Sequence, residues 1–244
     1  MRALCGIVLT LTSRPVLAGE ARCWVDHGAL VVAASFGDIA GDFILDASTP
    51  KSALHLTRAQ GDGIDAPSAT RRLVVAGERL PGFSMDVVDL DARTAMFDTV
   101  INGVIGVDML RRFVVDIDFA PCRVRLSRVA PPRPRGVERL SIRELEGVPT
   151  IRASVSDGVA ARFDDFAIDT GRAASVITGA TLSRAPKPGA DPPIRIRALA
   201  LAGQVFEQTP AQVGEANSVG MSVWTKTRLR LDLRDGWIEV APAQ

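Results

Sequence analysis

The stretch Phe166-Ala167-Ile168-Asp169-Thr170-Gly171 places a carboxylate between a short apolar run and a glycine. A related stretch, Phe43-Ile44-Leu45-Asp46-Ala47-Ser48, occurs 123 residues earlier. In both copies a Phe, a hydrophobic pair and an Asp stand in register, and a serine, Ser52 or Ser175, recurs six residues after the Asp. The chain therefore contains two copies of one unit, in which an aspartate ends a short strand.

Two further pairs of segments support an internal duplication. Leu-Val-Val-Ala-Gly at 73–77 matches Leu-Ala-Leu-Ala-Gly at 199–203, at a spacing of 126. Residues 104–118 match residues 218–232 at a spacing of 114. The order of the three pairs is preserved and the spacings differ only by loop-sized amounts, so chance is a poor explanation.

Each half is predicted to be built from β-strands. Short apolar or alternating runs are bounded by Gly, Pro and Asp, and helix signals are limited to residues 54–60 and 107–112. The segment 130–136, Ala-Pro-Pro-Arg-Pro-Arg-Gly, cannot continue a helix or a central strand and is interpreted as a linker. The expected fold class is all-β, with one lobe over 19–129 and a second over 137–244.

The first 18 residues have the layout of a secretory signal peptide. A positive start is followed by an apolar run at 3–11, a break, and the small-residue segment Val16-Leu17-Ala18. The alternative is that this run forms the first core strand of a cytosolic protein. We expect export to the periplasm or the extracellular space. No later apolar run is long enough for a membrane helix, so stable membrane insertion is not expected.

Composition excludes several classes of function. The chain has 244 residues, with 29 Lys and Arg, 28 Asp and Glu, and 47% hydrophobic residues. This composition does not suit a disordered chain, and it lacks the basic excess of a nucleic-acid-binding protein. Two histidines and no metal or nucleotide motif predict no cofactor and no metal site. Removal of the signal leaves Cys23 and Cys122, which either pair or stay free; the spacing does not decide.

The stretch around Asp169 resembles the active-site loop of the aspartic proteases. Residues 102–118, with Val104-Ile105-Gly106 at their centre, resemble the second signature of bacterial retropepsin-like members. The resemblance covers nearly all of residues 24–242. It implies two pseudo-symmetric small β-barrel lobes, with Gly106 and Gly220 as backbone-packing positions. It also implies a monomer that binds peptide or unfolded protein between its lobes.

The resemblance further implies that Asp46 and Asp169 form a catalytic pair. Two carboxylates held close together cannot both ionise easily, so they share one proton. The ionised acid takes a proton from water, and the protonated acid donates to the carbonyl of the peptide bond. Thr170, Gly171, Ser52 and Ser175 would support the loops.

The first loop departs from the family pattern. Ala47 replaces a hydroxyl residue that would bond across to the opposite loop, and Ser48 adds a Cβ where the family has Gly. Ser48 or Thr49 is an alternative source of the lost hydroxyl. Two functions therefore stay open: an aspartic endopeptidase, or a degenerate relative that binds peptide or has a structural role.

Three smaller expectations concern loops and strand ends. Residues 61–71 are predicted to overhang the cleft as a flap, because their composition suits a mobile loop. Asp118 and Asp232 are predicted to have structural roles in hairpin turns. Asp116 and Arg230 are predicted to face solvent.

Overall fold

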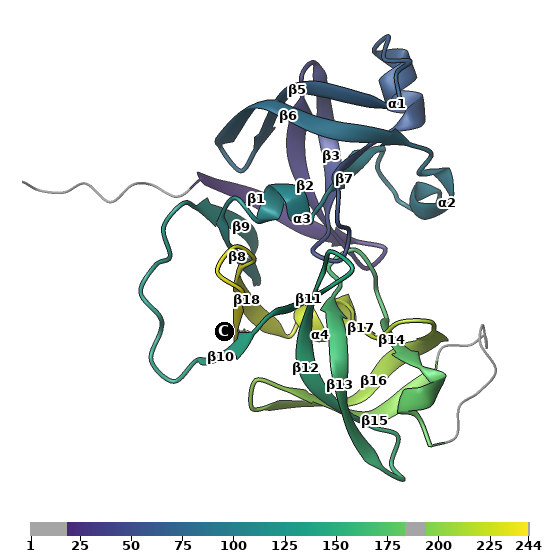
Figure 1. Cartoon of the computed structure of the whole chain (residues 1–244), viewed down its shortest axis with the longest axis vertical. Coiled ribbons are helices and arrows are strands. Elements are labelled where there is room, and N and C mark those ends of the chain that lie inside the picture. Colours follow the sequence, from purple (N-terminus) through teal and green to yellow (C-terminus); the bar gives the residue numbers. More distant parts are fainter. Residues whose placement is uncertain (1–18, 184–193, 244) are drawn as a thin grey trace, which may run out of the picture.

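The computed structural model describes residues 19–183 and 194–243, which form two β lobes, one above the other in Figure 1. The predicted signal peptide, residues 1–18, lies outside the described residues. The strands of the first lobe are β1 (Gly19–Asp26), β2 (Ala29–Phe36), β3 (Ile39–Leu45), β4 (Ala53–His55), β5 (Ser68–Val75), β6 (Glu78–Val88), β7 (Ile101–Ile105), β8 (Val114–Phe119) and β9 (Cys122–Ser127). Its helices are α1 (Leu56–Gly61), α2 (Asp91–Thr94) and α3 (Val107–Leu110).

The second lobe repeats this order of elements. Its strands are β10 (Glu138–Ser141), β11 (Arg143–Leu145), β12 (Val148–Ser156), β13 (Ala161–Ile168), β14 (Ser175–Thr178), β15 (Ile194–Leu201), β16 (Gln204–Gly214), β17 (Ser218–Val219), β18 (Thr227–Asp232) and β19 (Trp237–Pro242). A 3-10 turn, Gly179–Thr181, follows β14, and the short helix α4 (Met221–Trp224) follows β17. The exact lobe boundaries at 19, 130 and 137 stay a prediction; the segment between β9 and β10 contains neither helix nor strand.

Each lobe contains a closed barrel of six strands. In the first, the order β2-β3-β7-β4-β6-β5 is closed by pairing of β2 with β5. In the second, the order β12-β13-β17-β14-β16-β15 is closed by pairing of β12 with β15. The predicted all-β, two-lobed architecture is confirmed.

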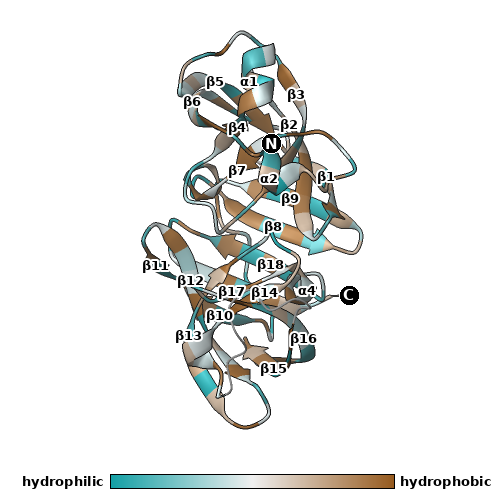
Figure 2. Ribbon diagram, turned by 90° about the vertical axis from the view of Figure 1, so that its right-hand side faces the viewer, coloured by the Kyte–Doolittle hydropathy of each residue, from teal (hydrophilic) through white to brown (hydrophobic). Residues whose placement is uncertain are grey.

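Apart from β11, which pairs with β12, the strands outside the barrels form one sheet that joins the lobes. Its order is β10-β19-β18-β8-β9-β1, and the lobes meet at the antiparallel pair of β18 and β8. Figure 2 shows β8 and β18 between the lobes, with β5 near one end of the molecule and β15 near the other. Because each lobe contributes three strands in mirrored order, this sheet sets the two barrels about a pseudo-twofold axis.

Matching details in the two lobes reflect the internal duplication. β3 runs parallel to β7, and β13 runs parallel to β17. The hairpin β5–β6 turns at Ala76 and Gly77, with φ of 46° and 76°, and β15–β16 turns at Ala202 and Gly203, with φ of 48° and 68°. These paired left-handed residues are what a two-residue hairpin turn needs, and they explain why the Ala-Gly pair recurs.

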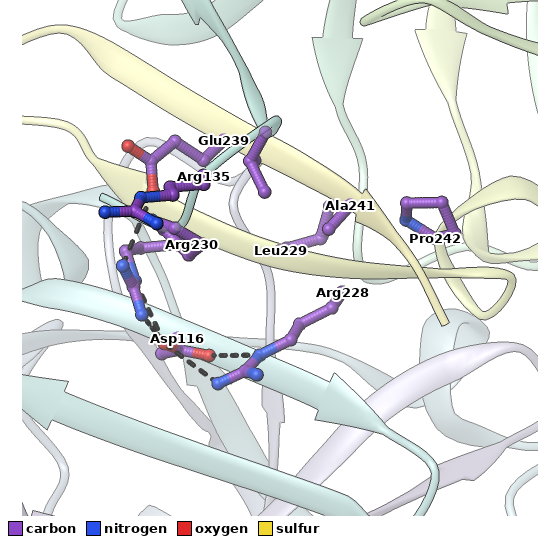
Figure 3. Close-up of a pocket in the computed structure, with 10 residues that line it drawn as sticks. Asp116, Arg135, Arg228, Leu229, Arg230, Glu239, Ala241 and Pro242 are labelled. Atoms are coloured by element: carbon purple, nitrogen blue, oxygen red, sulfur yellow. Dashed lines mark hydrogen bonds and ion pairs between the residues drawn. The ribbon is translucent and has the colours of Figure 1, made fainter. Parts of the chain in front are cut away.

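Ion pairs and a disulfide hold the strands around the lobe junction. Asp116 on β8 accepts hydrogen bonds from Arg228 and Arg230 on β18, beside a pocket shown in Figure 3. The prediction that Asp116 and Arg230 face solvent is therefore wrong, since the two lobes bury Asp116 between them and the Arg230 side chain is only 12% exposed. Cys23 on β1 and Cys122 on β9 form a disulfide, with 5.0 Å between their Cα atoms.

Asp118 and Asp232 have the turn roles that the sequence predicts. The Asp118 carboxylate accepts from the N–H of Ala120, and that of Asp232 accepts from the N–H groups of Arg234 and Asp235. None of the described helices is long and apolar enough to cross a bilayer.

Candidate functional site

Asp46 and Asp169 lie at equivalent places in the two lobes and face one cavity. Asp46 follows β3 and Asp169 follows β13, and each backbone N–H donates to the neighbouring β7 or β17. Both carboxylates line a cavity of about 550 Å³. The other residues that line it are Ser48, Thr49, Ala92, Arg93, Gly171 and Arg172. The structure thus brings together two acids that are 123 residues apart in the sequence.

Asp169 sits in a buried environment with few donors. Its Oδ1 accepts from the N–H of Gly171 at 3.1 Å, and its Oδ2 is 3.3 Å from both Ser218 Oγ and Arg172 Nε. Burial raises the pKa of Asp169, and the nearby charge of Asp46 raises it further. Asp169 therefore keeps its proton to a higher pH than an exposed aspartate does.

Asp46 is surrounded by donors. Its Oδ1 accepts from both the N–H and the hydroxyl of Ser48 at 2.7 Å. Its Oδ2 accepts from Thr49 Oγ1 at 2.7 Å and from Arg93 Nη2 at 2.5 Å. The Asp46 carboxylate thus accepts four hydrogen bonds of 2.5–2.7 Å, whereas the Asp169 carboxylate accepts three of 3.1–3.3 Å.

Gly171 allows the two loops to approach closely. A Cβ on this residue would lie 2.6 Å from Asp46 Oδ2 and 2.5 Å from Arg93 Nη2. A Cβ here would therefore force the Asp46 carboxylate and the Arg93 guanidinium to shift. Ser48 is the counterpart of Gly171 in the first loop, and its hydroxyl turns back to Asp46.

Of the two equivalent loop residues Thr170 and Ala47, only Thr170 makes side-chain hydrogen bonds to the opposite lobe. Thr170 Oγ1 donates to the carbonyl of Leu45 at 2.7 Å and accepts from the N–H of Ala47 at 3.0 Å. The methyl group of Ala47 cannot return these bonds. The alternative sources do not replace them either, because the hydroxyls of Ser48 and Thr49 bond to Asp46 in their own loop.

The two predicted loop serines have matching roles. Ser52 Oγ accepts from the N–H of Gly106 at 2.9 Å, and Ser175 Oγ accepts from that of Gly220 at 3.1 Å. A Cβ on Gly106 would lie 2.4 Å from the Thr49 carbonyl oxygen, and one on Gly220 would lie 2.5 Å from that of Ala174. These four residues therefore tie the end of β7 or β17 to the loop that carries each aspartate.

The predicted flap is wrong, and a segment that the sequence analysis missed covers the site instead. No residue of 61–71 lines the cavity, and α1 lies at the far end of the upper lobe in Figure 1. Ala92 and Arg93, on α2, line it. They belong to the insertion 89–100, which we define as the twelve residues between β6 and β7; only three residues separate β16 from β17.

A signal for this insertion was present in the sequence. The spacing between matched segments falls from 126 to 114 between the second and third pairs, so the first half is twelve residues longer there. The spacing locates the insertion, but it says nothing about where Arg93 points. Arg172 directly follows the Asp-Thr-Gly motif, but the sequence does not indicate that its side chain lines the cavity.

One group of side chains outside the cavity has the geometry of metal ligands. Asp26, His27 and Asp98 place three potential ligand atoms within 4.8 Å of one another near the β1–β2 turn. Two of the three residues are exposed, and exposed acidic groups of this kind are common without a metal.

A search of solved structures gives a match over almost the whole chain. The structure is similar to the aspartic proteinase from Irpex lacteus, with a TM-score of 0.59 and 12% sequence identity, over 93% of this chain and 98% of that chain. The fold is that of the aspartic proteinases. At this identity the likeness shows the aspartic proteinase fold and not the activity. No family model and no curated protein sequence matches the chain.

Proposed function

We propose that the protein is an aspartic endopeptidase that cleaves extended peptide between its lobes. One observation carries this proposal: two aspartates from equivalent loops of the two lobes face one cavity, and one of them has a raised pKa. Paired carboxylates pushed toward different protonation states are the arrangement that acid–base hydrolysis at neutral-to-acidic pH requires. The aspartic proteinase fold adds a scaffold whose known example acts as a proteinase.

The asymmetric surroundings assign the two roles. Asp46, whose carboxylate accepts four short hydrogen bonds including one from Arg93, takes a proton from water as the water oxygen attacks the carbonyl carbon of the peptide bond. Asp169 gives its proton to the carbonyl oxygen, which forms a diol intermediate. As the diol collapses, one of its hydroxyls returns a proton to Asp169, the C–N bond breaks, and the proton on Asp46 passes to the leaving nitrogen. The pair titrates as a unit, so its apparent pKa values belong to both residues.

Arg93 is the observation that favours the second candidate, peptide binding without cleavage. Its guanidinium occupies Asp46 Oδ2, where an attacking water would need to bind. A cavity closed permanently in this way would retain the cleft but not the chemistry. The two candidates differ in whether this contact opens when peptide enters.

Hydrolysis of an unstructured protein over a range of acidic pH tests the proposal. We expect a bell-shaped pH profile, because activity needs one protonated and one ionised acid. Asp46→Asn and Asp169→Asn should each reduce kcat/KM by about 10³-fold or more, since general acid and base catalysis each contribute on the order of 10²–10⁴-fold. Asp38→Asn, at an exposed turn between β2 and β3, is the matched control and should cleave like the wild type.

Two results would separate the candidates. Cleavage that survives Asp46→Asn unchanged would rule out the two-acid mechanism. A wild type that binds a statine-type transition-state mimic no better than an ordinary peptide, and cuts nothing, would instead support the binding candidate.

We also propose that the protein is exported and acts as a monomer. The Cys23–Cys122 disulfide supports an oxidising compartment. Cell fractionation with mass spectrometry of the mature N-terminus tests the first proposal, and light scattering tests the second. A protein retained in the cytoplasm with Met1 in place would contradict export.

A further inference from the structure

Two arginines are the cations that face the cavity of the aspartate pair. Arg93 comes from α2 in the first lobe, and Arg172 comes from the loop after Asp169 in the second. They approach from opposite lobes, as the two aspartates do. A peptide that lies between the lobes would therefore pass between two guanidinium groups.

The Arg172 guanidinium has hydrogen-bond donors without partners among the described residues. Its side chain is 57% exposed, and its only hydrogen bond among the described residues is the 3.3 Å contact from Nε to Asp169. Both terminal nitrogens are thus free of partners in the part of the chain that the structure describes. A planar guanidinium with two free nitrogens binds a carboxylate through two parallel hydrogen bonds.

A second cavity continues from the same arginines. It also has a volume of about 550 Å³, and it shares Ala92, Arg93, Gly171 and Arg172 with the first. Its walls are largely apolar and include Met96, Phe97, Ala173, Ala174 and Pro210. A peptide that crosses both cavities would place one residue at the arginines and an apolar neighbour against these walls.

We propose that the cleft selects peptides with an internal Asp or Glu beside the bond that is cut, and that this side chain draws Arg93 away from Asp46. The inference rests on the proposed endopeptidase function and names its substrate class. The carboxylate of the peptide takes the place of Asp46 as the partner of Arg93, and Asp46 Oδ2 becomes free to bind water. Recognition and activation are then one event.

The insertion 89–100 is suited to this movement. No residue of α2 is buried. The segment is held at its start, where Leu90 packs in the core and the Asp89 carboxylate accepts from the N–H of Asp91. Between Asp91 and Val100 every residue is exposed or half-buried. Segments with so little buried apolar surface open locally at low free energy. Exchange of one carboxylate for another also keeps the charge of Arg93 paired throughout.

Binding can be measured separately from cleavage. Uncleavable reduced-amide peptides would carry Glu or Gln at each position that flanks the reduced bond, with an acetylated N-terminus and an amidated C-terminus. Fluorescence anisotropy should show Glu peptides binding about tenfold more tightly than Gln peptides at one position, the size expected of a charge-assisted hydrogen bond. Equal affinities at every position would overturn the inference.

Substitutions of the two arginines identify which side chain binds the carboxylate of the peptide. Arg172→Gln and Arg93→Gln should each reduce the preference for Glu, and Arg172→Glu should shift it toward a Lys peptide. Arg197→Gln, at an exposed position on β15 away from both cavities, is the matched control and should keep the preference. A Glu preference that survives both Arg93→Gln and Arg172→Gln would contradict the assignment. Peptides with a free C-terminus test whether the arginines bind a terminal carboxylate instead of an internal Asp or Glu. Tight binding of these peptides alone would overturn the proposal of an internal acidic residue.

Cleavage of the matching natural peptides tests the movement of Arg93. Arg93→Gln should raise kcat/KM for the Gln peptide, because Asp46 is no longer covered, and should remove the advantage of the Glu peptide. Equal cleavage of Glu and Gln peptides by the wild type would overturn the inference and leave the endopeptidase standing. If Glu peptides bind preferentially but no peptide is cleaved, the carboxylate-binding site is supported and the endopeptidase function is contradicted.

Discussion

The loop of Asp169 and the loop of Asp46 have the same place in two equivalent barrels, but they are held in different ways. The Asp169 loop is tied to the other lobe: the Thr170 hydroxyl bonds to Leu45 and Ala47, and the Thr170 carbonyl accepts from the N–H of Leu30 at 2.8 Å. The Asp46 loop is tied locally, by the hydroxyls of Ser48 and Thr49, and by Arg93 from the insertion 89–100.

The missing cross-lobe bonds have two causes in the sequence. Ala47 removes the hydroxyl. The second cause is Pro149, which is the counterpart of Leu30 because each is the second residue after an equivalent turn, Gly28 in the β1–β2 hairpin and Gly147 in the β11–β12 hairpin. Proline has no N–H, so no donor reaches the Ala47 carbonyl from this position. The cross-lobe bonds on this side are therefore absent at two residues, and local hydroxyls with an arginine support Asp46 instead.

The largest effect is expected from a substitution that forces the two aspartate loops apart. Gly171→Ala would place a Cβ within 2.6 Å of Asp46 Oδ2, so the carboxylate or the loop must shift. A shift of about 1 Å at a reacting group costs on the order of 100-fold in rate, and kcat/KM should fall by that factor. Gly61→Ala, where a Cβ has open space, is the control and should retain full activity.

Thr170 carries the next largest effect, on stability. Thr170→Val keeps the shape but leaves the Ala47 N–H and the Leu45 carbonyl unpaired in a buried site, which should cost about 3 kcal/mol of unfolding free energy. Thr49→Val removes the hydroxyl's bonds to Asp46 and Arg93 on the partly open side and should cost about 1 kcal/mol. Urea denaturation measures both. Equal losses would show that the two loops are supported alike.

The raised pKa of Asp169 predicts a stability that depends on pH. In the unfolded chain Asp169 loses its proton at a lower pH than in the folded protein, so the folded state holds more protons in the window between the two pKa values. Wild-type stability that comes from this residue should be complete below that window and fall as pH rises through it. Asp169→Asn cannot ionise, so its unfolding free energy relative to the wild type should rise across the window. A flat difference would show that burial does not disfavour the ionised form.

Restoration of the clamp is expected to have the smallest effect. Ala47→Thr supplies the hydroxyl, and Pro149→Ala supplies an N–H beside it. Each new cross-lobe hydrogen bond should add about 1 kcal/mol to the unfolding free energy. The double variant should gain more than either single variant if the two changes restore one linked set of bonds. Additive losses in urea denaturation would show that the first loop is already settled in its local arrangement.

The sequence by itself determined the duplication, the β class, the two-lobed fold and the two aspartates at strand ends. Each of these follows from local patterns: apolar strands, Gly and Pro turns, and matched spacings that are readable without knowledge of contacts. The departure at Ala47 was also visible, and so was the length of the insertion 89–100.

Only the tertiary structure decided how the site is completed. Arg93 reaches Asp46 across 47 residues of chain, and the direction of a side chain from an irregular insertion is set by packing that no local pattern encodes. The role of Pro149 depends on the pairing register of two hairpins. The flap was misplaced because loop composition reports mobility and not position. The alternation of apolar and polar residues in a strand is visible in the sequence. The partner of a charged side chain in a loop is instead set by tertiary contacts, which form only when the two lobes pack together.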